Sequence, residues 1–525
     1  MMNRREALLG IGAGTAGVLA GVRPFRYWAD TLGTVSAFEP DVDIALVAAP
    51  DAVQLRPGAR TRVWRFTGSV IKGAANSVQA VPNSYLGPTL RFKRGQKVRI
   101  RFRNNLAEPS IVHWHGLDVP ELADGHPRFA IAPGAEYVYE FEVINRAGTY
   151  WYHPHAHGST GKQVYQGLAG MLVVTDDGER ALALPSGNED LVCLLQDRTI
   201  DSGNQFAYLA GGMMDQMHGL LGTTMLVNGQ ERASFALATR AYRFRILNAS
   251  SSRVYKLTWD DGTPMTVVGA DGGLLARPLQ QPFLTLAPSQ RADVILDLSN
   301  HAVGTSIQLR SAPFTGSEVS IDESGMMGGR GRGMMGGMMG GTAGTGTPNG
   351  ASLLLMTVQV SRKEQSAFRL PAQLSNYGPE WAEQAGAPVR NISLDFRAGQ
   401  WLLGGRVFDM MGVAPDEIVR AGSTHIWEIK NVGGMMGQQM AHPLHVHGTQ
   451  FRVLSRTRPA DATTPAQSVR EGLVDEGWRD TVLVMPNDTL RLQLRFTQFP
   501  GMYLYHCHIL EHEDAGMMRN FKVTA

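Results

Sequence analysis

A pattern of alternating apolar and polar residues occurs three times along this chain of 525 residues, and it limits the fold more than any other feature of the sequence. Residues 95–104, 239–248 and 422–431 each alternate with the period of a half-buried β-strand. Each copy is followed by a strand that opens at a proline and then by a strand that opens at a glycine, at 133–143 and 148–153, at 288–298 and 304–309, and at 486–496 and 501–506. Short alternating strands between glycine and proline turns indicate β-sandwiches, so the sequence predicts an all-β chain of three similar sandwich domains.

The repeats also predict where the domains begin and end. We expect domains at 38–178, 185–315 and 385–525, with an insertion and linker at 316–384. Within this linker, residues 325–346 are almost wholly glycine and methionine with two arginines, which offers too little apolar surface to offset the entropy of ordering. We therefore expect 325–346 to be a mobile surface insertion.

Composition and charge exclude several classes of protein. With 43% hydrophobic and 18% charged residues, the chain has enough apolar side chains for several cores and does not have the composition of a disordered protein. Its 49 basic and 47 acidic side chains leave a net charge of +2, so no overall positive field attracts nucleic acid or an anionic membrane. We expect neither as a partner.

The first residues have the pattern of an export signal. Arg4 and Arg5 precede a glycine-rich apolar run that ends near Val22. The run has about 16 residues, fewer than the roughly 20 that span a bilayer. Residues 1–37 thus look like a twin-arginine signal with small residues for cleavage at 35–37, and an ordinary N-terminal helix is the alternative. We expect a periplasmic or otherwise extracytoplasmic protein with no membrane span.

Ten of the 15 histidines lie in five short clusters, and four of these clusters contain a His-x-His pair. Two residues spaced i and i+2 on a strand point to the same side, so each pair presents two imidazoles together. The first repeat has two pairs and the third has two, whereas the middle repeat has none. Eight imidazoles exceed the roughly four ligands of a single zinc ion, which indicates a centre with more than one metal. The paired residues are His113 and His115, His153 and His155, His445 and His447, and His506 and His508.

Cys507 lies between two of these histidines, so strand alternation places its thiol on the opposite face of the strand from both rings. His512 and Met517 follow it at the spacing of loop ligands, and His442 lies three residues before His445. One thiolate, two imidazoles and a thioether form a trigonal site that favours copper and electron transfer.

At this point the residues resemble a known family, the multicopper oxidases, along all three predicted domains. Four motifs carry the resemblance: His-Trp-His-Gly at 113–116, Trp-Tyr-His-Pro-His at 151–155, His-Pro-Leu-His-Val-His-Gly at 442–448, and His-Cys-His-Ile-Leu-Glu-His-Glu-Asp-Ala-Gly-Met at 506–517. The resemblance implies three cupredoxin-like Greek-key β-sandwiches. It also implies an oxidase that couples four one-electron oxidations of a donor to the reduction of O₂ to two waters.

The resemblance further implies which residues hold four copper ions. The type 1 copper would be held by His442, Cys507, His512 and Met517, and the type 2 copper by His113 and His445. The type 3 pair would be held by His115, His153, His155, His447, His506 and His508. No ligand position is missing, which argues against a copper-free relative.

Cys507 would pass electrons to its flanking histidines, and two acidic residues look like the family's proton donors. Asp124 comes nine residues after His115, and Glu513 directly follows His512. Either acid could relay protons through water. The alternatives are that Asp124 forms a common turn dipeptide with Gly125, and that Glu513 only orients a ligand.

Clustered methionines point to the electron donor, because thioether sulfur is a soft ligand suited to Cu(I). Met435, Met436 and Met440 lie just before His442 and are candidate ligands for a substrate copper ion. In these clusters the chain is similar to the bacterial periplasmic cuprous oxidases of the copper-efflux type, which convert Cu(I) to Cu(II). It departs from them at Gln438 and Gln439, where a carboxylate would be expected.

Several alternatives remain at this stage. The methionines at 213–217 suit core packing as well as metal capture, and the insertion also fits a low-complexity loop with no ligand role. The runner-up function is a laccase-like oxidase of phenols or aromatic amines, and the next is a periplasmic copper-sequestering protein without turnover. A two-domain nitrite reductase is disfavoured because that architecture lacks a middle repeat. We expect a monomer whose partners are O₂ and a one-electron donor, with Cys193 buried by packing.

Overall fold

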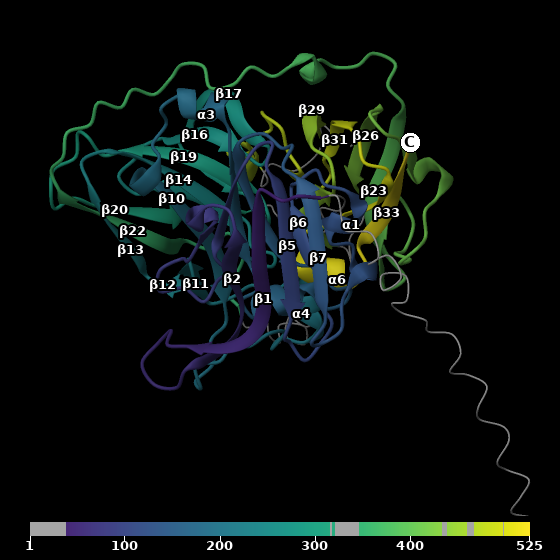
Figure 1. Ribbon diagram of the computed structural model, residues 1–525, viewed down its shortest axis with the longest axis horizontal. Helices are drawn as coiled ribbons and strands as arrows, with labels where there is room; N and C mark the ends of the chain where they lie inside the picture. The colour runs from purple at the N-terminus through teal and green to yellow at the C-terminus, as the bar shows by residue number, and fades with distance from the viewer. Residues whose placement is uncertain (1–37, 316–317, 321–345, 433–437, 459–466, 497) are drawn as a thin grey trace, which may run out of the picture. The chain divides into compact units, whose positions relative to one another are not determined.

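The computed structural model describes residues 38–315, 318–320, 346–432, 438–458, 467–496 and 498–525. The predicted export signal, the glycine- and methionine-rich stretch 325–345, and Met435 and Met436 lie outside the described residues. From residue 40 onward the described chain consists of strands, a few short helices and their connections (Figure 1). The predicted all-β class is confirmed.

Two sheets form the first sandwich, and both contribute to one apolar core that includes Phe102 and Leu172. One sheet has the order β2-β1-β5-β7, with β1 (Val42–Val53), β2 (Thr61–Lys72), β5 (Lys97–Asn104) and β7 (Glu136–Glu142). The other has the order β3-β4-β9-β8-β6, with β3 (Val78–Gln79), β4 (Thr89–Lys93), β6 (Val112–His115), β8 (Gly148–Pro154) and β9 (Gly170–Thr175).

The middle sandwich packs its two sheets around a core that includes Phe244 and Val358. One sheet has the order β12-β11-β10-β14-β19-β16-β17, with β10 (Asp190–Arg198), β11 (Thr224–Val227), β12 (Gln230–Glu231), β14 (Ala241–Asn248), β16 (Met265–Ala270), β17 (Gly273–Gln281) and β19 (Arg291–Asp297). The other has the order β13-β22-β20-β15-β18, with β13 (Ala233–Ala238), β15 (Tyr255–Trp259), β18 (Leu284–Leu286), β20 (Ser306–Ser311) and β22 (Leu353–Arg362). Cys193 is buried in this core, as its apolar surroundings in the sequence predict.

The third sandwich surrounds a core that includes Trp427, Leu444 and Cys507. One sheet has the order β24-β23-β26-β31-β29, with β23 (Val389–Arg397), β24 (Gln400–Leu403), β26 (Thr424–Asn431), β29 (Phe451–Thr457) and β31 (Thr489–Arg495). The other has the order β25-β33-β32-β28-β30, with β25 (Ile418–Arg420), β28 (His442–Val446), β30 (Thr481–Val484), β32 (Gly501–Cys507) and β33 (Met518–Thr524).

The strand repeat predicted from the sequence corresponds to the same pairing in all three sandwiches. The first repeat strand pairs antiparallel with the proline-led strand in each case, as β5 with β7, β14 with β19 and β26 with β31. On its other edge it pairs parallel with a preceding strand, as β5 with β1, β14 with β10 and β26 with β23. The glycine-led strands β8, β20 and β32 lie in the facing sheets.

One strand of the middle sandwich lies within residues 316–384, which the sequence predicts to be only insertion and linker. β22 pairs parallel with β13 and antiparallel with β20, so residues 353–362 complete the middle sandwich beyond residue 315. Its apolar residues alternate, but the glycine- and methionine-rich stretch separates it from the rest of its repeat. The chain then continues through 363–388 to the third sandwich, which is the long green connection of Figure 1.

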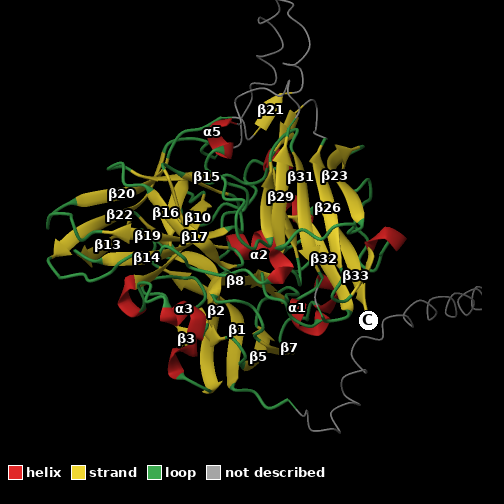
Figure 2. Ribbon diagram, turned by 90° about the horizontal axis from the view of Figure 1, so that it is seen from above, coloured by secondary structure: helices red, strands yellow, loops and turns green. Residues whose placement is uncertain are grey.

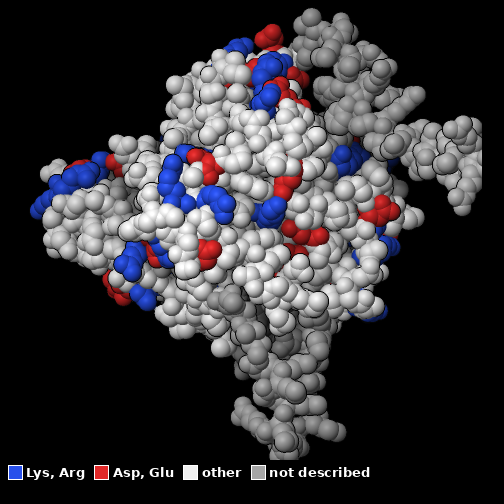
Figure 3. Space-filling model, turned by 90° about the horizontal axis from the view of Figure 1, so that it is seen from below, with Lys and Arg blue, Asp and Glu red and all other residues white. Residues whose placement is uncertain are grey.

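Short helices lie mainly in the connections between strands, and α2 and β8 lie near the centre of the view in Figure 2. Helix α6 of the third sandwich packs against α2 of the first and against α4. No helix among the described residues is both long and apolar enough to cross a membrane. Basic and acidic side chains are interspersed on the face drawn in Figure 3. The helices are α1 (Glu121–Asp124), α2 (Thr160–Tyr165), α3 (Asp177–Ala181), α4 (Met213–His218), α5 (Gln467–Arg470) and α6 (Leu510–Asp514).

Candidate metal centre

Two pairs of adjacent strands place the paired histidines. In the first sandwich β6 and β8 run antiparallel with His113 opposite His153. In the third sandwich β28 and β32 run antiparallel with His445 opposite His506. The alternation of each strand then turns the second member of each His-x-His pair toward the same side as the first.

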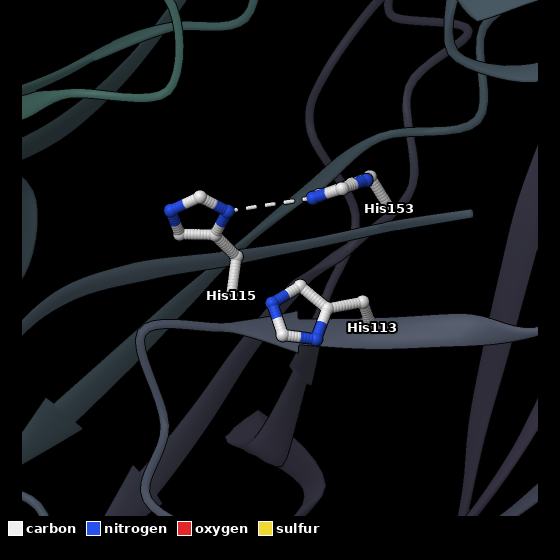
Figure 4. A group of neighbouring side chains, drawn as sticks. All are labelled: His113, His115 and His153. Atoms are coloured by element: carbon white, nitrogen blue, oxygen red, sulfur yellow. Dashed lines mark hydrogen bonds between the residues drawn. The ribbon is translucent and has the colours of Figure 1, made fainter. Parts of the chain in front are cut away.

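The structure brings the histidines of the first and third sandwiches into one buried cluster. The ring of His113 stacks on that of His447, and the ring of His115 stacks on that of His445, with 3.7 Å between ring centroids in both cases. The ring of His508 lies 5.1 Å from that of His115. All eight paired histidines are buried. Figure 4 shows three of them, His113, His115 and His153, with the His115 and His153 rings facing each other.

Backbone carbonyls decide which ring nitrogen faces the cluster. His113 Nδ1 lies 2.6 Å from the Asp124 carbonyl and His445 Nδ1 lies 2.8 Å from the Asp480 carbonyl. A carbonyl oxygen only accepts, so both Nδ1 atoms donate and both Nε2 atoms carry bare lone pairs. These two Nε2 atoms lie 3.3 Å apart. Two lone pairs that face each other at this distance repel, and a cation between them removes the repulsion.

A second pair of ring nitrogens repeats this arrangement. His506 Nδ1 donates to the Cys507 carbonyl at 3.0 Å, which leaves its Nε2 lone pair free to face the cluster. That Nε2 lies 3.1 Å from His447 Nε2 and 3.3 Å from His155 Nε2. Both ring nitrogens of the buried His508 lack a hydrogen-bond partner within the described part of the chain. The donor set therefore fits metal ions that imidazole binds, such as copper.

Burial keeps the clustered rings neutral. It lowers the pKa of His153 to about 3 and that of His506 to about 4, because removal from water disfavours the charged ring. The pKa of His113 is also lowered well below its usual value, first by burial and then by neighbouring histidines. Neutral imidazole is the form that binds metals, so the cluster needs no deprotonation step near neutral pH.

A second donor group lies on the other face of β32, as the alternation around Cys507 predicts. Cys507 Sγ lies 3.4 Å from His442 Nδ1 and 3.8 Å from His512 Nδ1. His512 Nε2 donates to the Met217 carbonyl at 3.0 Å, so its Nδ1 lone pair faces the sulfur. Burial raises the pKa of the Cys507 thiol, so a bound metal would displace its proton. Met517 is buried in the same core, and its backbone carbonyl accepts a hydrogen bond from the Cys507 N–H at 3.0 Å.

The two predicted proton donors both lie against the histidine cluster. Asp124 ends α1, and its Oδ2 lies 2.8 Å from His447 Nδ1. Glu513, on α6, lies 3.5 Å from His155 Nε2 through Oε1 and 3.3 Å from His506 Nδ1 through Oε2. Burial raises the pKa of both carboxyl groups well above the usual value. Each acid thus contacts a cluster histidine, and burial disfavours its charged form.

The sequence did not point to two charged residues at the cluster. Asp480 Oδ1 lies 3.0 Å from His115 Nε2, and Arg291 of the middle sandwich donates to both oxygens of Asp480. Asp480 precedes β30 in a Trp-Arg-Asp-Thr segment without a recognisable motif, and Arg291 lies in the repeat that has no histidine pair. Their contact depends on how three sandwiches pack together, which strand periodicity does not reveal.

The methionines of α4 lie beside the Cys507 group. Met217 contacts His512 through its carbonyl, as described above, and Met213 and Met214 on the same helix are 72% and 44% exposed. The exposure of Met213 and Met214 shows that these two side chains are not core residues. Met440 is half-buried two residues before His442.

The residues that flank the stretch 321–345 contact the segments before His442 and after α4. At one end, β21 (Glu318–Ser320) pairs with β27 (Gln438–Met440), with Glu318 in register with Met440. At the other end, Thr347 N donates to the Gly222 carbonyl at 3.3 Å, four residues after α4. The chain thus leaves and re-enters the described structure beside strand and helix segments that adjoin His442 and His512.

Comparisons with known proteins cover most of the chain. Family models described as multicopper oxidase match residues 64–179 and 388–525. A multicopper oxidase of Staphylococcus haemolyticus (strain JCSC1435) is 32% identical over 439 residues, covering 84% of this chain and 82% of that protein. A laccase of Bacillus subtilis (strain 168) is 29% identical over 88% of this chain and 90% of the laccase. The crystal structure of McoA multicopper oxidase from Aquifex aeolicus covers 93% of this chain and 97% of that chain, with a TM-score of 0.74 and 31% identity. The predicted cupredoxin-like fold is confirmed.

Proposed function

Because the chain belongs to the multicopper oxidase family, we propose that it is a cuprous oxidase, which oxidises Cu(I) to Cu(II) and reduces O₂ to two waters. Family membership makes it an oxidoreductase that uses copper cofactors, O₂ and a reductant. The observation that carries the choice of Cu(I) is α4, which exposes two methionines and touches His512 through a third.

The proposed copper ligands follow the donor groups described above. His442, Cys507, His512 and Met517 are assigned to the type 1 copper, and His113 and His445 to the type 2 copper. The type 3 pair is assigned to His115, His153, His155, His447, His506 and His508. Copper bound at these residues would accept electrons one at a time beside Cys507 and deliver four of them to O₂ at the histidine cluster.

The chain's own residues would connect the two donor groups and supply protons. Cys507 is bonded through the backbone to His506 and His508, so the thiol and the cluster are joined by covalent bonds. Asp124 and Glu513 would hold the protons that O₂ reduction consumes, because both carboxyl groups are buried against cluster histidines.

The methionines of α4 and of the stretch 325–345 would capture Cu(I) close to His512. Thioether sulfur prefers Cu(I). Residues 318–320 pair with β27, which precedes His442, and Thr347 contacts Gly222, which follows α4. Met435, Met436 and Met440 remain proposed ligands for the substrate copper ion. We further propose that the chain is exported by the twin-arginine route through Arg4 and Arg5, which would place Cu(I) oxidation outside the cytoplasm.

The experiment compares two methionine variants with a matched control. One replaces Met213, Met214 and Met217 with Leu, and the other lacks residues 325–345. The control carries Met265→Leu and Met356→Leu, two fully buried positions in the middle core. Leucine preserves volume and removes sulfur, so folding should be retained. Steady-state O₂ consumption is measured with Cu(I) and with a phenolic donor.

We expect both methionine variants to raise KM for Cu(I) by roughly 10-fold or more, because even outer contacts of a metal site are worth roughly 10–100-fold in affinity. Phenol oxidation and the control should keep their wild-type values. Unchanged Cu(I) kinetics together with faster phenol oxidation would instead assign the laccase-like function. Copper binding without any O₂ consumption would assign copper sequestration.

A further inference from the structure

Arg291 is a fully buried arginine of the middle sandwich whose side chain lies between the two sandwiches that carry the histidines. Its Nε donates to the Thr149 carbonyl of β8 at 3.0 Å. Its Nη1 and Nη2 donate to Asp480 Oδ1 and Oδ2 at 2.8 and 2.5 Å. The carbonyls of Ser289 and Asp271 accept from the same two nitrogens at 3.0 and 2.9 Å. All five N–H groups therefore have acceptors, and the planar fork has one orientation.

Asp480 transmits this orientation to His115. Its Oδ1, already held by Arg291, lies 3.0 Å from His115 Nε2. A carboxylate fixed by an arginine fork accepts hydrogen bonds, so His115 Nε2 donates and the Nδ1 lone pair faces the cluster. That Nδ1 lies 3.4 Å from His153 Nε2, which is the contact drawn in Figure 4.

His115 is thereby reversed relative to four other cluster histidines. His113, His153, His445 and His506 all donate through Nδ1 to backbone carbonyls and turn Nε2 toward the cluster. Backbone carbonyls cannot be removed by a side-chain change, whereas the orientation of His115 depends on a carboxylate. That carboxylate in turn depends on one arginine from another sandwich.

The backbone next to His115 is built around the same ion pair. A Cβ added at Gly116 would lie 2.5 Å from Asp480 Oδ2 and 2.8 Å from Arg291 Nη2. Gly116 also has φ 90°, which side chains other than glycine rarely adopt. Directly after β6, the backbone therefore packs closely against the Arg291–Asp480 ion pair.

We propose that Arg291 is a positioning residue that, through Asp480, sets which ring nitrogen of His115 faces the metal centre. The middle sandwich, which carries no histidine pair, would in this way control metal binding between the other two. The inference rests on the proposed function, because it needs copper at the histidine cluster. A purely structural ion pair would stabilise the fold without changing the affinity of the cluster for metal.

The test uses copper-loaded protein and measures chelator competition for each kind of copper. The variants are Arg291→Met, which keeps the aliphatic stem, Arg291→Lys, which keeps the charge without the fork, and Asp480→Asn. The matched control is Arg243→Met, which also breaks a buried arginine–carboxylate contact of the middle sandwich, with Glu179 and Asp293. Copper per chain, the blue absorbance of the Cys507 site and the thermal unfolding of the metal-free protein are measured for every variant.

We expect Arg291→Met and Asp480→Asn to release cluster copper at chelator concentrations 10- to 100-fold below wild type, as for other residues that orient metal ligands. Arg291→Lys should fall between, since one ammonium cannot hold both carboxylate oxygens. The blue absorbance should respond to chelator as in wild type. Arg243→Met should lower the unfolding temperature and leave the copper midpoints unchanged.

The proposal is overturned if the Arg291 and Asp480 variants release cluster copper at the same chelator concentration as Arg243→Met. If Arg291→Met does not fold, the proposal is tested by the chelator concentration at which Arg291→Lys and Asp480→Asn release cluster copper. A wild-type chain that binds no copper at the histidine cluster would instead remove the proposed function, so the two failures are distinguishable.

Discussion

At the scale of single residues, the metal centre depends on hydrogen bonds that decide which face of each ring is available. The motifs in the sequence predict the ten clustered histidines, Cys507 and the acids, and the structure brings all of these together. They do not predict which ring nitrogen is used, because that depends on carbonyls contributed by other segments, such as Asp480 opposite His445. Residue identity is thus readable from sequence, while tautomer and orientation require the fold.

Glu513→Gln tests proton delivery at this scale. The amide keeps the shape of the side chain but cannot supply a proton to the cluster, 3.5 Å from His155 and 3.3 Å from His506. We expect O₂ consumption at saturating donor to fall by roughly 10²–10⁴-fold, the range for loss of a general acid. Copper content should remain at the wild-type value.

The control for this substitution is Glu511→Gln on the same helix. Glu511 accepts a hydrogen bond from Leu220 N at 3.1 Å, which an amide oxygen also accepts. Equal turnover for the Glu511 and Glu513 variants would assign Glu513 the orienting role instead. Matching copper contents are required for the comparison.

At the scale of strands and helices, local periodicity in the sequence predicts where the repeated strands lie. It does not predict which strands pair when they are far apart in the sequence. Every strand of the threefold repeat appears in the structure with a repeated partner. The sequence does not predict β22 as part of the middle sandwich, because residues 312–352, which include the glycine- and methionine-rich stretch, separate it from β20, and its partners β13 and β20 are themselves distant in sequence. The sequence also does not predict that α4 lies beside His512, because the residues in contact, Met217 and His512, are 295 residues apart.

The junction between the first and middle sandwiches contains a buried cluster of ion pairs that can be tested separately. Arg243 of β14 contacts Glu179 of α3 and Asp293 of β19, and Arg245 lies 3.4 Å from both acids. Breaking a buried pair costs about 3–5 kcal/mol. Because Arg245 still faces both acids, we expect Arg243→Met to lower the free energy of unfolding by about 3 kcal/mol, the lower end of that range.

Denaturant unfolding of the metal-free protein measures this loss. The comparison is Arg103→Met, which breaks a largely exposed pair with Glu136 and should change the free energy of unfolding by less than about 1 kcal/mol. A change of the same size in both variants would show that the buried cluster contributes no more than a surface pair.

At the scale of the whole chain, folding without metal buries many histidine side chains close together. The ten clustered histidines all have pKa values below the usual 6.5, with His153 and His442 at about 3 and His506 at about 4. Above pH 6.5 neither the folded nor the unfolded chain protonates them. As pH falls below 6.5 the unfolded chain binds protons that the folded chain excludes, so the folded state loses stability.

We expect chelator-treated protein to lose stability steeply between pH 6.5 and pH 4, by about 1.4 kcal/mol per histidine for each unit of pKa difference. Five described buried acids with raised pKa oppose this trend, but they are fewer than the ten histidines. Urea unfolding across this pH range, with and without copper, measures the effect. Copper-loaded protein should show a shallower slope, and metal-free protein that gains stability on acidification would contradict the expectation.

The sharing of one centre between two distant sandwiches also affects how the protein is made. His113 and His445 are 332 residues apart, and the proposed type 1 ligands include Met517 as well. Domains generally fold as units with the N-terminal one first, so the first sandwich would form before its four paired histidines can meet those of the third. Neither donor group can be complete until synthesis has passed residue 517, so copper insertion must be a post-translational step.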